Sequence, residues 1–63
     1  MTVVEFMYLF IEESKQKMIL FDTERGENVF EGYFADLPED YFLRYVSSID
    51  NILPDSDTIT INI

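Results

Sequence analysis

The carboxylates are the side chains in this sequence that could carry out chemistry, because thirteen Asp and Glu face only four Lys and Arg. Two carboxylic acids about 5–10 Å apart in a cleft can hydrolyse a glycosidic bond. Asp22 and Glu31 are expected on neighbouring strands, where they could approach each other in this way. A sheet with one helix in a 63-residue chain offers no evident cleft for such a pair. The sequence therefore predicts a protein that is not an enzyme.

Other catalytic and metal chemistry needs residue types that the chain lacks. It contains no His and no Cys, so a serine nucleophile has no histidine base and a Cys/His zinc site cannot form. Asp50, Asp55 and Asp57 could contact a hard cation, but their spacing does not match a calcium-binding EF-hand loop. The two glycines make no phosphate-binding loop. We expect no catalytic residue, no cofactor and no bound metal.

The net charge of -9 restricts the partners that the chain can have. Nucleic acids and anionic lipids are bound by clustered Lys and Arg, so we expect no nucleic-acid and no membrane partner, and a charged partner should be basic. No apolar run approaches the roughly 20 residues of a membrane helix. Residues 1–11 lack the basic start and the cleavage site of a signal peptide. With no cysteine, these features predict a cytoplasmic protein.

Three strands are expected in the first half of the chain. The segment Thr2–Glu12 is rich in β-branched and aromatic residues, which favour a strand over the competing helix. The segments Lys17–Asp22 and Asn28–Phe34 follow, joined by a tight turn in which Gly26 is the residue able to adopt a positive φ. Together the three strands are expected to form an antiparallel meander.

The second half of the chain is expected to hold one helix and two more strands. Asp36, followed by Glu39 three residues later, resembles a capping box, and Pro38 suits a first helical turn, so a helix is expected from Leu37. Asp40 and Arg44 are then spaced to pair on it. The segment around Tyr45–Ile49 is read either as the end of this helix or as a fourth strand, and the alternating Thr58–Ile63 as a terminal strand. The prediction is one α+β domain, residues 1–63, with an antiparallel sheet in the order β-β-β-α-β-β and the helix packed on one face.

Aromatic residues exceed what such a small domain can bury. Six Phe and four Tyr accompany many aliphatic residues, whereas a chain of this length buries only about 60% of its unfolded surface. Some aromatic side chains should therefore remain exposed and form an interface, where Tyr and Phe are enriched. The sequence favours a protein-interaction module that associates with itself as a homo-oligomer. Four tyrosines are the candidate contacts: Tyr8, Tyr33, Tyr41 and Tyr45.

The surplus of carboxylates supports an alternative function. Rows of acidic side chains can imitate the phosphates of a nucleic acid and so inhibit a basic host protein that handles DNA or RNA. Against this, runs of charge usually only face water and keep a small protein soluble. The candidate acidic contacts are Glu31, Asp36, Glu39 and Asp40.

Three segments, 21–32, 37–40 and 46–50, together resemble small acidic proteins encoded by bacteriophages and mobile elements of Gram-positive bacteria. The resemblance spans about half of the chain and lies in its turn and cap residues. It implies a bacterial cytosolic setting and a role in contact with host proteins. Because small phage inhibitors of host DNA enzymes are often acidic, it also adds to the alternative of a nucleic-acid mimic.

Overall fold

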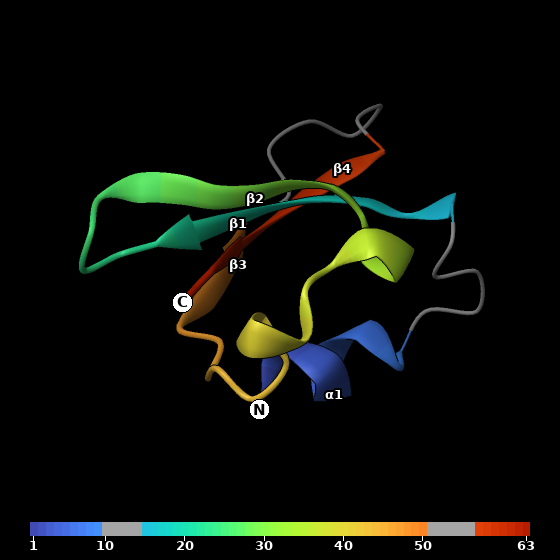
Figure 1. The fold of residues 1–63 in the computed structure, drawn as a ribbon, viewed down its shortest axis with the longest axis horizontal. Helices are drawn as coiled ribbons and strands as arrows, with labels where there is room; N and C mark the ends of the chain where they lie inside the picture. The colour runs from blue at the N-terminus through green and yellow to red at the C-terminus, as the bar shows by residue number, and fades with distance from the viewer. Residues whose placement is uncertain (10–14, 51–56) are drawn as a thin grey trace.

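The structure, a computed structural model, describes residues 1–9, 15–50 and 57–63. A short helix lies on one side of a four-stranded sheet (Figure 1), so the expected α+β class is confirmed. The connection between the second and third strands forms two 3-10 helices. In chain order the elements are α1 (Val3–Met7), β1 (Lys17–Asp22), β2 (Glu27–Tyr33), η2 (Phe34–Asp36), η3 (Glu39–Tyr41), β3 (Ser48–Asp50) and β4 (Thr58–Asn62).

The sheet is mixed, with the strand order β2-β1-β4-β3. The pairs β1–β2 and β3–β4 are antiparallel, whereas β1 and β4 run parallel at the centre. The expected hairpin of the second and third predicted strands is therefore confirmed. The wholly antiparallel order is wrong, because β4 pairs in parallel with β1 and so joins the two antiparallel pairs β1–β2 and β3–β4.

The β1–β2 turn forms as its glycine predicts. Gly26 has φ 67°, and its N–H donates to the Asp22 carbonyl at 2.8 Å. A side chain is disfavoured at this positive φ, so glycine is the residue that lets the chain reverse there. The register then shifts by one residue between Leu20 and Phe21, a β-bulge that adds twist to the hairpin.

The first predicted strand is wrong over the described part of its length, because residues 3–7 form α1. The Thr2 hydroxyl accepts the Glu5 N–H at 3.3 Å, and the Glu5 carboxylate accepts the Thr2 N–H at 2.9 Å. This reciprocal pair is a capping box, and it satisfies N–H groups that a helix start would leave free. The helical spacing also places Val3 and Met7 together in the core. Residues 10–12 of the predicted strand lie outside the described residues.

The predicted helix from Leu37 is also wrong, since the chain there forms η2 and η3 with an extended link between them. Leu37 and Pro38 have ψ values of 128° and 142°. A proline disfavours helical backbone at the residue before it, which explains why Asp36 does not start an α-helix at Leu37. Neither 3-10 helix has a side-chain cap, so the Asp36–Glu39 capping box does not form.

The last two strands follow the prediction in part. Only the end of the 45–49 segment becomes a strand, as β3 begins at Ser48 and pairs with β4. The alternation of the terminal strand is confirmed, since Ile61 and Ile63 are buried and Ile59 packs against the core.

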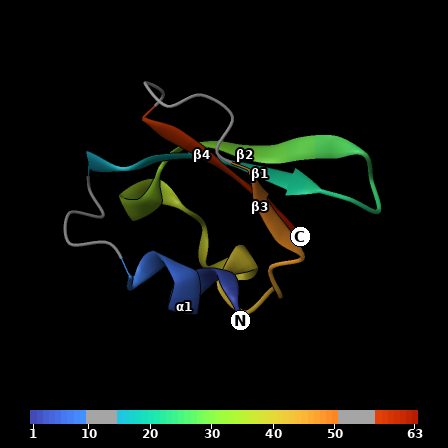
Figure 2. The same ribbon diagram turned by 180° about the vertical axis from the view of Figure 1, so that it is seen from behind.

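The core lies between the sheet and the chain segments that cover one side of the sheet. Figure 2 shows this arrangement from behind. We call these segments, residues 1–9 and 34–46, the α1 layer. The rings of Phe6 and Phe34 meet edge to face at 6.5 Å, and Phe34 is 1% exposed. Both sheet and α1 layer contribute buried apolar side chains, namely Val3, Met7, Met18, Leu20, Phe34, Leu37, Ile61 and Ile63.

Candidate functional site

Two segments distant in sequence lie side by side in the α1 layer. The N–H groups of Val3 and Val4 donate to the carbonyls of Arg44 and Phe42 at 2.9 and 3.0 Å. The Val46 N–H donates to the Met1 carbonyl at 2.9 Å, and Thr2 forms an antiparallel bridge with Tyr45. The start of the chain is therefore held along residues 42–46.

Large apolar side chains point outward from these segments. Tyr8 is 72% exposed, Leu43 77% and Tyr45 74%. Tyr8 lies one helical turn beyond Val4, since its N–H donates to the Val4 carbonyl, and Val4 is itself bonded to Phe42. Leu43 and Tyr45 thus come from the segment bonded to the start of the chain, and Tyr8 is the C-cap of α1, one turn further along. We call the exposed side chains of Tyr8, Leu43 and Tyr45 together the apolar surface. Met1 and Leu9 are also exposed in the same layer.

Carboxylates accompany the apolar surface. Glu39 and Asp40 are exposed in η3 and precede Leu43 by four and three residues in a run of tight turns. The Glu5 carboxylate is bound to Thr2, which faces Tyr45. We call Glu5, Glu39 and Asp40 the acidic border. Asp36, in η2, is also exposed in the α1 layer.

Glu5 is held in its charged form by its hydrogen bonds. The Thr2 backbone N–H, and then its hydroxyl, lower the pKa of the Glu5 carboxyl below its usual value, against a smaller opposing effect of desolvation. Arg44 is the one basic side chain in the sequence of the α1 layer, and its guanidinium lies 3.6 Å from Asp22. The α1 layer therefore contains four carboxylates and one guanidinium, and this guanidinium faces Asp22 on the sheet.

Six of the eight candidate residues lie in the α1 layer. Five of the six are exposed, namely Tyr8, Asp36, Glu39, Asp40 and Tyr45. Tyr41 is only partly exposed and packs against the core. Tyr33 and Glu31 lie on β2 and pair with Lys17 and Ile19 on the sheet face that points away from the core.

Sequence reasoning missed Leu43, the most exposed of the large apolar residues described. The segment that holds it is expected as part of the helix from Leu37, whereas in the structure it lies beside the start of the chain and Leu43 is exposed. No local signal distinguishes an outward Leu43 from an inward one.

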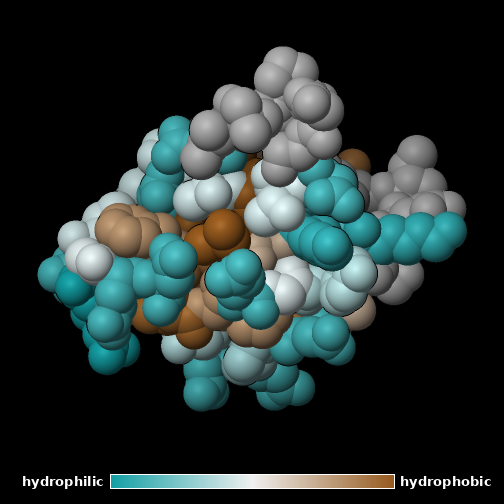
Figure 3. Space-filling view, turned by 90° about the horizontal axis from the view of Figure 1, so that it is seen from above, coloured by the Kyte–Doolittle hydropathy of each residue, from teal (hydrophilic) through white to brown (hydrophobic). Residues whose placement is uncertain are grey.

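The outer face of the sheet is a second surface, and it carries the candidate residues Tyr33 and Glu31. Figure 3 looks onto it from the side opposite α1 and shows hydrophobic atoms near its middle with hydrophilic atoms around them. Ile19 and Phe21 belong to this face and are only partly exposed. The Lys17 ammonium lies 5.8 Å from the centre of the Tyr33 ring, a cation–π contact. Tyr33 and Glu31 are therefore separated from the apolar surface by the sheet itself.

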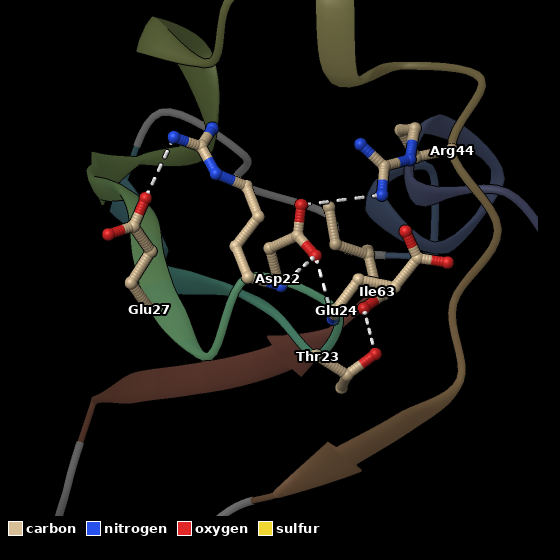
Figure 4. Close-up of polar contacts among 7 residues, drawn as sticks. Asp22, Thr23, Glu24, Glu27, Arg44 and Ile63 are labelled. Carbon is tan, nitrogen blue, oxygen red and sulfur yellow. Dashed lines mark hydrogen bonds and ion pairs between the residues drawn. The ribbon is translucent and has the colours of Figure 1, made fainter.

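The carboxylate pair considered for acid–base chemistry does not assemble. Asp22 lies opposite Glu27 in the hairpin, not opposite Glu31, and Asp22 and Glu31 point to opposite faces of the sheet. One oxygen of Asp22 accepts the N–H groups of Glu24 and Arg25, while the other faces Arg44 (Figure 4). The buried Asp22 carboxylate is thus occupied in holding the turn.

The cation ligands considered in the sequence also have other contacts where they are described. Asp50 accepts the Asn62 side-chain amide at 3.0 Å, and the Asp57 carbonyl accepts the Gln16 amide. Asp55 lies outside the described residues. Within residues 1–9, 15–50 and 57–63, no group of three or more acidic side chains is arranged to hold a metal ion, and the surface has no enclosed pocket.

None of the helices in the described part of the chain is long and apolar enough to cross a membrane. Comparison of the chain with family models, with curated proteins and with solved structures finds no match.

Proposed function

We propose that this chain is a non-enzymatic protein-interaction module and that the apolar surface is its main contact. The observation that carries the proposal is the exposure of Tyr8, Leu43 and Tyr45, each above 70%, on adjoining segments of a domain whose core is small. Tyr side chains are common anchors of protein interfaces, because each offers a large rigid area with a polar end.

The size of the apolar surface limits the affinity of such a contact. Burying one side chain of this kind contributes about 1.5–3 kcal/mol, whereas association costs about 4–15 kcal/mol in lost freedom of motion. Three anchors alone therefore support a weak complex, and a tighter one needs additional contacts at the acidic border.

Site-specific photocrosslinking tests the proposed function. Tyr45 or Leu43 is replaced by p-benzoylphenylalanine in the full chain, and Glu24, exposed in the hairpin turn, is replaced in a matched control. We expect the photoreactive side chain at position 43 or 45 to crosslink this chain to a partner protein molecule, and the one at position 24 to give few such crosslinks. Equal crosslinking from all three positions would show that the apolar surface is not a specific contact.

Self-association, expected from the surplus of aromatic residues, is one form of this proposal. Sedimentation equilibrium over a range of concentrations would then show a mass above that of the monomer, and Leu43→Ser would restore the monomer. A strictly monomeric chain at high concentration would remove this form and leave a contact with another protein.

The second candidate function is an acidic inhibitor of a basic nucleic-acid-handling protein. It is favoured by the exposure of Asp36, Glu39 and Asp40 on the same layer. Binding through these carboxylates should weaken steeply with salt, and changing Glu39 and Asp40 to Lys should abolish it. Binding that survives both high salt and these substitutions would exclude the acidic side chains as the contact.

A further inference from the structure

The outer face of the sheet, on the side opposite α1, carries apolar, acidic and basic side chains in a defined arrangement. β1 turns Lys17, Ile19 and Phe21 to this face, because the residues that alternate with them are buried in the core. Ile19 pairs with Glu31 and Lys17 pairs with Tyr33, so both β2 side chains lie on the same face. The Lys17 ammonium over the Tyr33 ring agrees with this placement.

This face has the make-up of a protein interface. Ile19 and Phe21 are partly exposed, and Figure 3 shows hydrophobic atoms near the middle of the face with hydrophilic atoms around them, as in the apolar middle and polar rim of known interfaces. β1 and β4 run parallel, and parallel strands are usually covered on both faces. The described helices α1, η2 and η3 lie on the other side of the sheet (Figures 1 and 2), so none of them provides a second cover.

Charge makes this face more suitable than the α1 layer for contact with a second copy. Its strand residues include one ammonium, on Lys17, and two carboxylates, on Glu31 and Asp50, and Asp50 already accepts the Asn62 amide. The α1 layer has one guanidinium and four carboxylates. Because like charges at an interface are unfavourable, two copies repel each other less through the sheet. A chain of 63 residues without cysteine also gains from a second subunit, since its own core is small.

The two charges beside Ile19 are arranged to complement themselves in a second copy. Lys17 precedes Ile19 by one alternation on β1, and Glu31 lies opposite Ile19 on β2. Within the described part of the chain, neither Lys17 nor Glu31 belongs to an ion pair. Contacts across a two-fold axis are reciprocal, so an axis beside Ile19 brings Lys17 of each copy to Glu31 of the other. Sheets packed face to face lie about 10 Å apart, a gap that long Lys and Glu side chains can bridge.

We infer that two copies of this chain pack through their outer sheet faces about a two-fold axis. Ile19 and Phe21 lie in the middle of the interface, and reciprocal pairs of Lys17 with Glu31 flank the axis. This inference goes beyond the proposed function, because it concerns a surface separate from Tyr8, Leu43 and Tyr45. The dimer leaves that apolar surface free to contact another protein.

Charge exchange followed by sedimentation equilibrium tests the inference on the full chain at low salt. Lys17→Glu and Glu31→Lys each turn both reciprocal pairs into like-charge pairs, so each variant should dimerise roughly tenfold more weakly than the wild type. An equal mixture of the two variants should restore dimers, because both pairs in the mixed dimer again join opposite charges. Repulsion within each chain is the same before and after mixing, so this recovery reports on the contact between copies.

Leu43→Ser is the matched control, since Leu43 is exposed in the α1 layer, and it should leave the dimer unchanged. Circular dichroism of each variant checks that it is folded. A wild-type chain that stays monomeric at high concentration, or a mixture that dimerises no better than its components, would overturn the inference. A dimer lost in Leu43→Ser but kept in both charge variants would place self-association on the apolar surface and also overturn it. The photocrosslinks from positions 43 and 45 test the proposed function separately, so either proposal can fail while the other stands.

Discussion

Arg44 Nη2 lies 3.6 Å from Oδ2 of Asp22, and this ion pair joins the α1 layer to the end of β1. The other Asp22 oxygen accepts the Glu24 and Arg25 N–H groups at 3.0 and 3.2 Å. One buried carboxylate thus holds the β1–β2 turn with one oxygen and the segment before β3 with the other. Because residues 42–46 carry two members of the apolar surface, the ion pair also helps to position that surface.

Removing the Asp22 carboxylate should separate its two roles. Asp22→Asn keeps an oxygen that can accept the turn N–H groups but loses the charge facing Arg44, whereas Asp22→Ala loses both. The Glu24 and Arg25 N–H groups are part-buried in these bonds. Because an N–H left without a partner there is costly, we expect Asp22→Ala to lower the free energy of unfolding more than Asp22→Asn. Urea unfolding of both variants measures the difference. Equal losses would show that the hydrogen bonds to the turn contribute little.

Stability should fall at acidic pH. The Arg25 N–H, and then the Glu24 N–H and the Arg44 charge, lower the pKa of Asp22 against the opposing effect of its burial. Its ionised form therefore stabilises the fold fully above the unfolded pKa of about 3.9, and this contribution is lost as the pH falls through the lower folded value. Glu5 acts with the same sign.

Urea unfolding repeated from neutral pH to below about pH 4 checks this dependence. The free energy of unfolding of the wild-type chain should decline at the acidic end of the range. Asp22→Asn cannot lose a charge at this position, so its decline should be shallower. Parallel curves for the two proteins would contradict a lowered Asp22 pKa.

The cap of α1 should be measurable even though the helix is short. Thr2→Ala removes the hydroxyl that accepts the Glu5 N–H, and loss of such a cap costs about 1 kcal/mol. Thr2→Ser retains the hydroxyl and should lose much less. Thermal unfolding followed by circular dichroism compares the variants, and similar melting temperatures for Thr2→Ala and Thr2→Ser would argue against the capping box.

The two glycines should respond to alanine for different reasons. Gly26→Ala has open space around the new Cβ but a positive φ, so the loss should be about 1–2 kcal/mol from backbone strain. Gly26→Asn should be milder, because Asn tolerates this conformation better. At Gly32 a new Cβ would lie 3.1 Å from the Phe30 ring, and the loss there depends on how far the ring moves. Equal stability of Gly26→Ala and Gly26→Asn in thermal unfolding would contradict the strain.

Phe34 is the largest fully buried side chain in the described part of the chain, and it belongs to the core between the sheet and the α1 layer. It is 1% exposed and meets Phe6 edge to face. Phe34→Ala should cost about 3–5 kcal/mol, a large part of the roughly 5–15 kcal/mol that stabilises a typical domain. Phe34→Leu refills most of the volume and should retain the fold. Near-native urea unfolding of Phe34→Ala would show that the layer is held mainly by other contacts.

Local patterns were sufficient for the hairpin and the terminal strand. The predicted strand 17–22, the turn at Gly26, and the alternation of Ile59, Ile61 and Ile63 all rest on short-range features that the structure confirms. At the start of the chain, the capping box of Thr2 and Glu5 outweighs the β-branched content that favours a strand. At Leu37, the restriction that Pro38 imposes on the preceding residue outweighs the cap that Asp36 could provide.

The candidate site was predictable only by residue type. Tyrosines and carboxylates suit interfaces, which predicts Tyr8, Tyr45, Glu39 and Asp40 as contacts, and the structure places all four in one layer. Leu43 is exposed in the same layer, but neither its residue type nor its neighbours in the sequence predict that exposure.

The acidic charge, the lack of His and Cys, the β1–β2 hairpin and the alternating last strand can be read from the amino-acid sequence, because they depend on composition and on neighbours a few residues apart. Three features appear only in the folded chain: the parallel pairing of β1 with β4, the pairing of Asp22 with Arg44, and the placing of Tyr8, Leu43 and Tyr45 in one layer. These contacts join segments far apart in the chain. They form because the whole domain buries one small core, and no local propensity reports which distant segment will cover it.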